Sequence, residues 1–391
     1  MKIVSLEPLS PVRLWKACLY ARLPLTDLDR RDTAILKAIA IFAIVFHNFF
    51  HVLGPVHENE FNFDAGRFPV FLHTVVHPAF AIQALFSFFG HYGVQIFIFL
   101  SAYGLAKTHW DDESSWSSFM GSRIKKLYPM FILVVVFWAL LAAIQEGAIS
   151  VIRGVGPGLL LVLAGISNLV PGRDLPVVGP WWFIPFIMQF YAIWPLLRKL
   201  TRKFGWPGLV VLCVACFVVT FLANPFLITH WSLNLAFTPI GRIRVFCLGI
   251  IAARHPVQIR SWLGLPAIGI IILGNEYHAV AHFSSLAIVV FSLWLYAHTR
   301  FLLRSFSWIE KVGNYSLAIF LVNGVVRIPF LAYARTTPLL QLSLGCASAA
   351  VTFAVSAFFH YLLEPAPETV PVHVLPQAAW GQAQSVSVVA D

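Results

Sequence analysis

Charged residues are scarce in this sequence. Only 11% of its 391 residues are Asp, Glu, Lys or Arg, whereas 59% are hydrophobic. A soluble domain carries about a quarter charged residues, so this composition excludes a soluble globular protein. The net charge is nevertheless +10, and the basic residues cluster in short loops between apolar runs. That pattern is typical of membrane proteins, in which basic loops set the orientation of the spanning helices. We therefore expect no nucleic-acid partner.

Cysteine is also sparse, and its arrangement does not indicate a metal or redox site. The chain has five cysteines. Cys213 and Cys216 have the spacing of a metal or redox pair, but they lie in an apolar run without a second pair or a βαβ context. In such a run, a cysteine is commonly a small hydrophobic packing residue. We therefore expect no metal and no cofactor.

The sequence shows neither a cleavable secretory signal nor an internal repeat. Residues 1–31 are interrupted by charge and proline and lack the apolar core of a signal peptide. We interpret residues 1–32 as a basic cytoplasmic leader, either a short helix on the inner membrane surface or a disordered segment. Residues 33–363 form the predicted transmembrane domain, and residues 364–391 a disordered cytoplasmic tail.

Long apolar runs fill the predicted transmembrane domain. A helix that crosses a bilayer needs about 20 mostly apolar residues. We therefore predict an all-α polytopic membrane protein with about ten transmembrane helices. The predicted spans are 33–53, 91–106, 127–145, 180–197, 206–223, 237–252, 262–274, 282–299, 314–334 and 339–362. A helix over the short run 158–170 would reach only about 20 Å, which favours a re-entrant or broken segment.

The basic loops predict the orientation of these spans. Lys107, Arg198, Arg254 and Arg300 each follow an even-numbered span. With ten crossings all these loops fall on one side, which the positive-inside rule assigns to the cytoplasm. Both termini are then cytoplasmic, and residues 54–90 form an excursion on the other face that contains Glu58 and Glu60, together with Asp64, His73 and His77. An eleventh crossing would place a basic loop outside.

Ionisable side chains inside a bilayer are costly, so those of the first span are informative. His47 and His51 are four residues apart and therefore share one helix face, and Asn48 follows His47 directly. A neutral imidazole near the outer half of this helix can accept a proton from a substrate hydroxyl, which is the task of a general base. A structural, hydrogen-bonded histidine is the alternative interpretation for either residue.

Five motifs follow one another in order between residues 35 and 323. They are ILKAIAIFAIVFH (35–47), Gly93-Val94 with IFIFLSAYGL (96–105), RIKKLYP (123–129), Trp182-Phe183 followed by Gln189-Phe190-Tyr191 and Trp194-Pro195, and Gly313-Asn-Tyr-Ser316 with residues 319–321. Together they resemble acyltransferase family 3, a family of multi-spanning membrane O-acyltransferases. Three positions depart from the family pattern. Nine rather than ten residues separate Lys37 from His47, Ile187-Met188 replace a common pair of glutamates, and Asn323 replaces a late histidine.

The resemblance implies a membrane O-acyltransferase of the bacterial cytoplasmic (inner) membrane. The implied reaction moves an acetyl group from cytoplasmic acetyl-CoA to a hydroxyl of an extracytoplasmic or lipid-linked saccharide, with exopolysaccharide as the favoured acceptor. His47 is the implied catalytic residue, assisted by His51. The expected partners are the bilayer, the acyl-CoA donor, the saccharide acceptor and other polysaccharide-assembly proteins.

A polyanionic donor on the inner face requires basic side chains there, because guanidinium groups pair well with phosphate. The residues assigned to donor binding are Lys37, Arg123, Lys125, Lys126, Arg242 and Arg244. Simple positive-inside anchoring is the alternative for those in the loop at 123–126. For Arg242 and Arg244, which lie deep in a span, a polar cavity is favoured.

The residues assigned to the acceptor are Asn48, Trp182, Asn323 and Arg327. Asn323 and Arg327 share a helix face and could bind a sugar or a developing oxyanion. Helix packing through asparagine and an interfacial aromatic belt are the alternatives. The alternative function is a transporter or flippase of a lipid-linked saccharide, although the repeated halves typical of many transporters are absent from the sequence.

Overall fold

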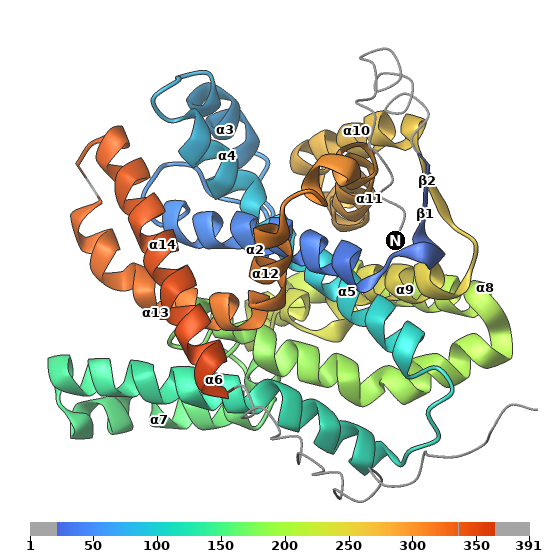
Figure 1. The fold of residues 1–391 in the computed structure, drawn as a ribbon, viewed down its shortest axis with the longest axis horizontal. Coiled ribbons are helices and arrows are strands. Elements are labelled where there is room, and N and C mark those ends of the chain that lie inside the picture. The colour runs from blue at the N-terminus through green and yellow to red at the C-terminus, as the bar shows by residue number, and fades with distance from the viewer. Residues whose placement is uncertain (1–21, 335, 364–391) are drawn as a thin grey trace, which may run out of the picture.

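The computed structural model describes residues 22–334 and 336–363, and this part of the chain is almost entirely helical (Figure 1). Its helices are α2 (Arg30–Phe50), α3 (Arg67–Val75), α4 (Ala81–Phe89), α5 (Gly93–Thr108), α6 (Trp116–Glu146), α7 (Ala148–Leu163), α8 (Phe183–Trp231), α9 (Pro239–Arg254), α10 (Gly264–Glu276), α11 (His278–Leu303), α12 (Ser307–Asn314), α13 (Ser316–Tyr333) and α14 (Pro338–Leu363). Two short strands, β1 (Arg22–Pro24) and β2 (Gln258–Arg260), pair antiparallel with Leu23 opposite Ile259.

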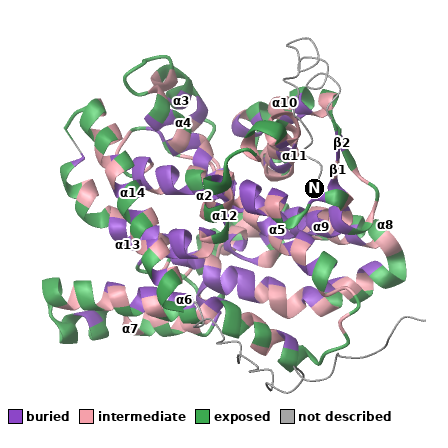
Figure 2. Ribbon diagram, viewed as in Figure 1, coloured by how far each residue is buried: buried purple, intermediate pink, exposed green. Residues whose placement is uncertain are grey.

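Helix α2 is the centre of the molecule. It begins at a capping box, in which the Asp29 carboxylate accepts the Asp32 N–H at 2.7 Å and the Asp32 carboxylate accepts the Asp29 N–H at 3.2 Å. Its apolar run is then covered on several sides, so that Ile35, Ala40 and Ile41 are fully buried. Helices α4, α5, α12 and α13 pack against it, and buried residues concentrate on α2, α5 and α9 (Figure 2).

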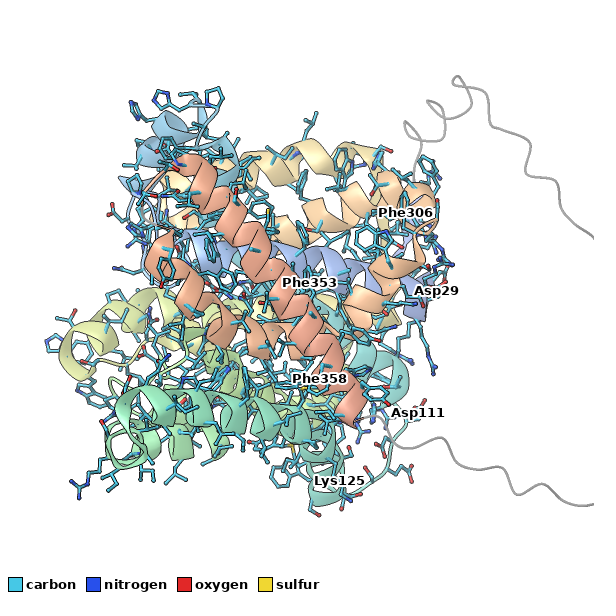
Figure 3. All side chains as sticks on the ribbon, turned by 60° about the vertical axis from the view of Figure 1, so that its left-hand side comes forward. Asp29, Asp111, Lys125, Phe306, Phe353 and Phe358 are labelled. Carbon is cyan, nitrogen blue, oxygen red and sulfur yellow. The ribbon has the colours of Figure 1, made fainter. Side chains whose placement is uncertain are left out.

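The basic loops meet at the Arg30 end of α2, which we call the basic end. Lys107 at the end of α5 donates to the Thr26 carbonyl at 2.7 Å. Arg202 pairs with Asp111 at 2.9 Å, and the Arg254 guanidinium lies 4.4 Å from the centre of the Trp110 ring. Asp29 and Asp111 lie along the same edge in Figure 3. We call the opposite end of α2, which carries His47, the distal end.

Helix α7 is a short apolar helix that begins directly after α6. It runs back beside α6 (Figure 1). The carbonyl of its last residue, Leu163, accepts a hydrogen bond from the Tyr128 hydroxyl at 2.6 Å. The helix stops at Gly165, whose φ of +75° suits glycine. The chain then returns, since the Gly172 N–H donates to the Ser232 carbonyl at the distal end. The short helix therefore covers Ala148–Leu163 rather than the expected 158–170, and its re-entrant character stays a prediction.

Eight helices in the described residues are long and apolar enough to cross a membrane. The sequence predicts about ten such helices, and two places account for the difference. Helix α8 counts once, although it consists of two helices joined by a kink at Gly205, where φ is +63° and ψ is −160°. The 13-residue helix α10 is too short for the length criterion. Large apolar side chains on α6, α7 and the second half of α8 are exposed, as expected for lipid contact.

The chain is thus an all-α polytopic membrane protein. The number of crossings, the side of the membrane and the division into domains stay predictions. Of the predicted leader, residues 22–32 are described and include β1 and the start of α2. The rest of that leader and the predicted tail after residue 363 lie outside the described residues.

Candidate active site

The His47 side chain is held in one orientation by the chain that precedes α5. Its Nδ1 lies 3.1 Å from the Ser87 carbonyl oxygen and 3.3 Å from that of Phe86. A carbonyl only accepts hydrogen bonds, so Nδ1 carries the proton and donates to both oxygens. Nε2 therefore keeps its lone pair in the neutral imidazole, as a general base requires.

Two further histidines surround His47. The ring of His51 stacks on the ring of His47, with centroids 4.6 Å apart, and its Nδ1 donates to the His47 carbonyl at 2.8 Å. The ring of His91 lies 5.7 Å from the His47 ring, and its buried Nδ1 has no hydrogen-bond partner in the described chain. The predicted pair on one face of α2 is thus part of a cluster of three imidazoles.

The loop after α2 brings two carboxylates to this cluster. Ligand atoms of His47, Glu58 and Glu60 all lie within 4.8 Å of one another. Such a group could hold a divalent cation, but the guanidinium of Arg242 already binds Glu60, and Arg327 lies on the same cavity. Positive charge so close opposes a cation. The expectation of a metal-free site therefore stays our prediction.

The ion pair between Glu60 and Arg242 is almost completely buried. Their side chains are 5% and 8% exposed, and the two groups are 3.1 Å apart. Burial raises the pKa of Glu60, whereas the charge and the hydrogen bond of Arg242 lower it and stabilise the carboxylate. The Arg242 guanidinium also lies 5.4 Å from the centre of the Phe61 ring and 5.9 Å from that of Trp182. These contacts fix the loop against α9.

A small cavity of about 90 Å³ opens in front of the histidines, and we call it the central cavity. Asn48, Trp182 and Arg327, all assigned to the acceptor from the sequence, lie on its wall with His47 and Glu58. Arg327 donates to the Asn48 carbonyl, while its Nε has no hydrogen-bond partner in the described residues. The structure thus gathers side chains from α2, α13 and two loops around one imidazole.

Asn323 does not line this cavity. Its residue is 1% exposed, and neither amide atom has a hydrogen-bond partner in the described part of the chain. It lies one helical turn before Arg327, as expected, but points into the packed interior. The structure therefore brings three of the four acceptor residues together and leaves Asn323 apart.

A second cavity, of about 640 Å³, lies at the basic end, and we call it the basic cavity. Lys37, Arg123 and Lys126 line it, whereas Lys125 is exposed beside it. Arg123 donates to Nε2 of His109 at 2.9 Å. Burial and the neighbouring Arg123 lower the pKa of His109, which keeps this imidazole neutral. Phe320 is part of the wall of both the basic and the central cavity.

A third cavity, of about 510 Å³, lies at the distal end, and we call it the distal cavity. Arg242 and Arg244 line it, so the structure separates these two from the other residues assigned to the donor. Glu60 and Phe61 line both the distal and the central cavity. The three cavities therefore follow one another from the basic end to the distal end, with His47 in the middle.

Four residues of this site were not among the candidates predicted from the sequence: Glu58, Glu60, Phe61 and His91. Glu58 and Glu60 follow His51 by less than ten residues in the sequence. Three ionisable groups so close together at the outer end of the first predicted span were a usable signal for a functional site. The conformation of the loop is what brings them back to His47, and no periodic pattern encodes it.

Gly90 allows the chain before α5 to lie directly on α2 at His47. A β-carbon on Gly90 would be 2.6 Å from the Ala43 carbonyl oxygen and 2.6 Å from the β-carbon of His47. We expect Gly90→Ala to displace His47 and to lower the rate of the acyl transfer implied by the sequence resemblance about 100-fold, since a shift of about 1 Å has that effect. Gly269→Ala is the control, because no atom lies within 4 Å of its added carbon. Initial rates in membranes measure both, and equal rates would contradict the role of this contact.

A polytopic helical protein with a buried neutral histidine between a basic and a distal cavity is a membrane protein equipped for acid–base chemistry. The sequence model of a family described as an acyltransferase domain matches residues 34–361. The chain therefore belongs to acyltransferase family 3 and is a membrane acyltransferase. Searches of the curated proteins and of the solved structures found no match.

Proposed function

We propose that this acyltransferase moves an acetyl group from acetyl-CoA in the cytoplasm to a hydroxyl of a saccharide on the other side of the membrane. The observation that carries the proposal is the position of His47. Its free Nε2 faces a small cavity with a basic cavity on one side and a polar cavity on the other. Two substrates can therefore meet at one imidazole from opposite ends.

The basic cavity suits the donor. Lys37, Arg123 and Lys126 offer positive charge to the phosphates of coenzyme A. The positive-inside rule favours the cytoplasm for this end, because the basic loops meet there. Both termini are cytoplasmic on this proposal, and the protein lies in the bacterial inner membrane. Phe320 separates the donor cavity from the central cavity, where the thioester would react.

The proposed reaction needs one base and a binding site for a developing negative charge. His47 Nε2 accepts the proton as the saccharide hydroxyl oxygen bonds to the thioester carbon. The carbon–sulfur bond then breaks, and His47 returns the proton to sulfur, giving the ester and free coenzyme A. Arg327 and Asn48 are placed to donate hydrogen bonds to the oxyanion, since Nε of Arg327 and Nδ2 of Asn48 have no partner in the described residues.

A comparison of surface polysaccharides tests the proposal. We expect ¹H NMR to show acetyl esters in cells that carry the gene and a loss of these signals in cells without it. The amount of exported polysaccharide should stay unchanged. Normal acetate content without the gene would contradict acetyl transfer, and a loss of export would favour transport of a lipid-linked saccharide instead.

Arg123 gives a separate test of the donor cavity. We expect Arg123→Gln to raise KM for acetyl-CoA about tenfold with a small change in kcat, because one charge-assisted hydrogen bond contributes about 1.5 kcal/mol. Lys125→Gln is the matched control, since Lys125 carries the same charge two residues away but is exposed outside the cavity. Equal KM values in the two variants would show that the donor binds elsewhere.

A further inference from the structure

Arg244 on α9 has no anionic partner among the described residues. It is 7% exposed, and its Nη2 donates to the Gly241 carbonyl at 3.3 Å. Its Nε and Nη1 are buried without any hydrogen-bond partner in the described chain. A buried guanidinium is costly unless an acceptor compensates its charge. An acceptor from outside the protein would satisfy this requirement.

The unpaired guanidinium belongs to the wall of the distal cavity. The Arg244 side chain lies 5.9 Å from the centre of the Phe217 ring. Nε2 of His282, on the same wall, is also buried without a hydrogen-bond partner in the described residues. Polar side chains from two helices, Arg244 on α9 and His282 on α11, are thus available to one ligand in a space of about 510 Å³, which is within the usual size range of ligand sites.

Charge on the wall of the distal cavity is unbalanced. Arg242 and Arg244 are its two arginines, and Glu60 is the one carboxylate among the described residues that line it. Glu60 is already paired with Arg242 at 3.1 Å. One positive charge is therefore uncompensated. The wall also carries the hydroxyls of Thr220, Thr229 and Ser285. Each donates to a backbone carbonyl and keeps an oxygen lone pair that can accept a hydrogen bond from a sugar hydroxyl.

We propose that the distal cavity binds an acidic saccharide through Arg244. The anionic group is a carboxylate of the sugar or a phosphate attached to it, because either one accepts two parallel hydrogen bonds from a guanidinium. This inference rests on the proposed function in that the bound saccharide is the acyl acceptor. Glu60 and Phe61, which line both cavities, connect this site to His47.

Binding measurements on the purified full-length protein test the inference independently of catalysis. The probes are a glucuronate-containing disaccharide, the neutral disaccharide of the same linkage, and glucose 1-phosphate, each titrated by calorimetry. We expect at least one anionic probe to bind and the neutral disaccharide to bind at least tenfold more weakly. The better of the two anionic probes distinguishes a carboxylate from a phosphate.

Variants of Arg244 assign the effect to this side chain. Arg244→Gln should weaken binding of the anionic probe about tenfold to a hundredfold, and Arg244→Lys, which keeps the charge but loses the fork, should give an intermediate affinity. Arg254→Gln removes an exposed charge from the same helix and is the control. Equal binding of neutral and acidic probes, no binding of either anion, or unchanged binding by both Arg244 variants would overturn the inference.

The outcomes separate this inference from the proposed function. If anion binding depends on Arg244 but the protein transfers no acyl group, the inferred binding site stands and the proposed function is refuted. If Arg244→Gln transfers acetyl to a neutral saccharide at the wild-type rate, the proposed function stands and the acidic acceptor is refuted.

Discussion

Acetyl transfer should fall about 10²-fold to 10⁴-fold when His47 is replaced by alanine, the range typical for loss of a general base. The reason is geometric. Two backbone carbonyls hold Nδ1, so Nε2 is the one nitrogen of His47 that can take a proton from the acceptor. Release of coenzyme A from acetyl-CoA in the presence of acceptor measures the rate.

His73→Ala is the control for the loss of His47, because His73 is an exposed histidine on α3 away from the three cavities. Each variant should reach the membrane in the amount of the wild type. A chelator should leave the wild-type rate unchanged on our proposal. Loss of activity with chelator and its recovery with a divalent cation would instead assign His47, Glu58 and Glu60 to a metal.

Removal of Asp32 should give the largest loss of stability. Its carboxylate is fully buried and accepts hydrogen bonds from the Tyr296 hydroxyl at 2.5 Å, from Arg300 at 2.6 Å and from Arg304 at 2.7 Å. Asp32→Ala leaves two arginines without this acceptor. We expect a loss of about 3 kcal/mol, the low end for a broken buried pair, because both arginines are about one third exposed.

Unfolding titrations in mixed micelles measure the effect of Asp32→Ala. The control is Asp111→Ala, which also removes a carboxylate from an arginine, Arg202, but at a side chain that is 87% exposed. Solvent screens that pair, so its loss should change the unfolding midpoint little. Equal midpoints in the two variants would show that the Asp32 cluster does not anchor α11 to α2.

The sequence predicted the long helices and the shared face of His47 and His51 well, because both depend on local patterns. Apolar runs mark the helices, and a spacing of four places His47 and His51 on one face. The family, which the match to residues 34–361 confirms, was accessible through motifs in order. A short segment was expected at 158–170, whereas α7 covers Ala148–Leu163, because its boundaries depend on where it packs against α6 and hydropathy does not record that contact.

The partners of the buried charges could not be predicted. Glu60 reaches Arg242 across 182 positions of sequence, and no spacing rule connects a loop to a helix so far away. Arg242 and Arg244 were assigned to the donor as basic residues in a span. The predicted topology, however, starts that span on the outer side near Phe237, so their depth already favoured the distal end. The sequence shows that Arg242 and Arg244 are positively charged. Their position along the helix, however, decides which of the two substrates they can contact.

The fixed orientation of His47 has a consequence for the energetics of turnover. With Nδ1 committed to carbonyl oxygens, Nε2 both receives the hydroxyl proton and gives it to the departing sulfur. On the proposed function, each cycle therefore moves the acetyl group outward as an acyl-cation equivalent, which leaves its bonding electrons on sulfur. One proton moves inward in exchange, from the hydroxyl to that sulfur. The exchange is electroneutral, so the membrane voltage neither drives the reaction nor opposes it, and the free energy of the thioester alone sets its direction.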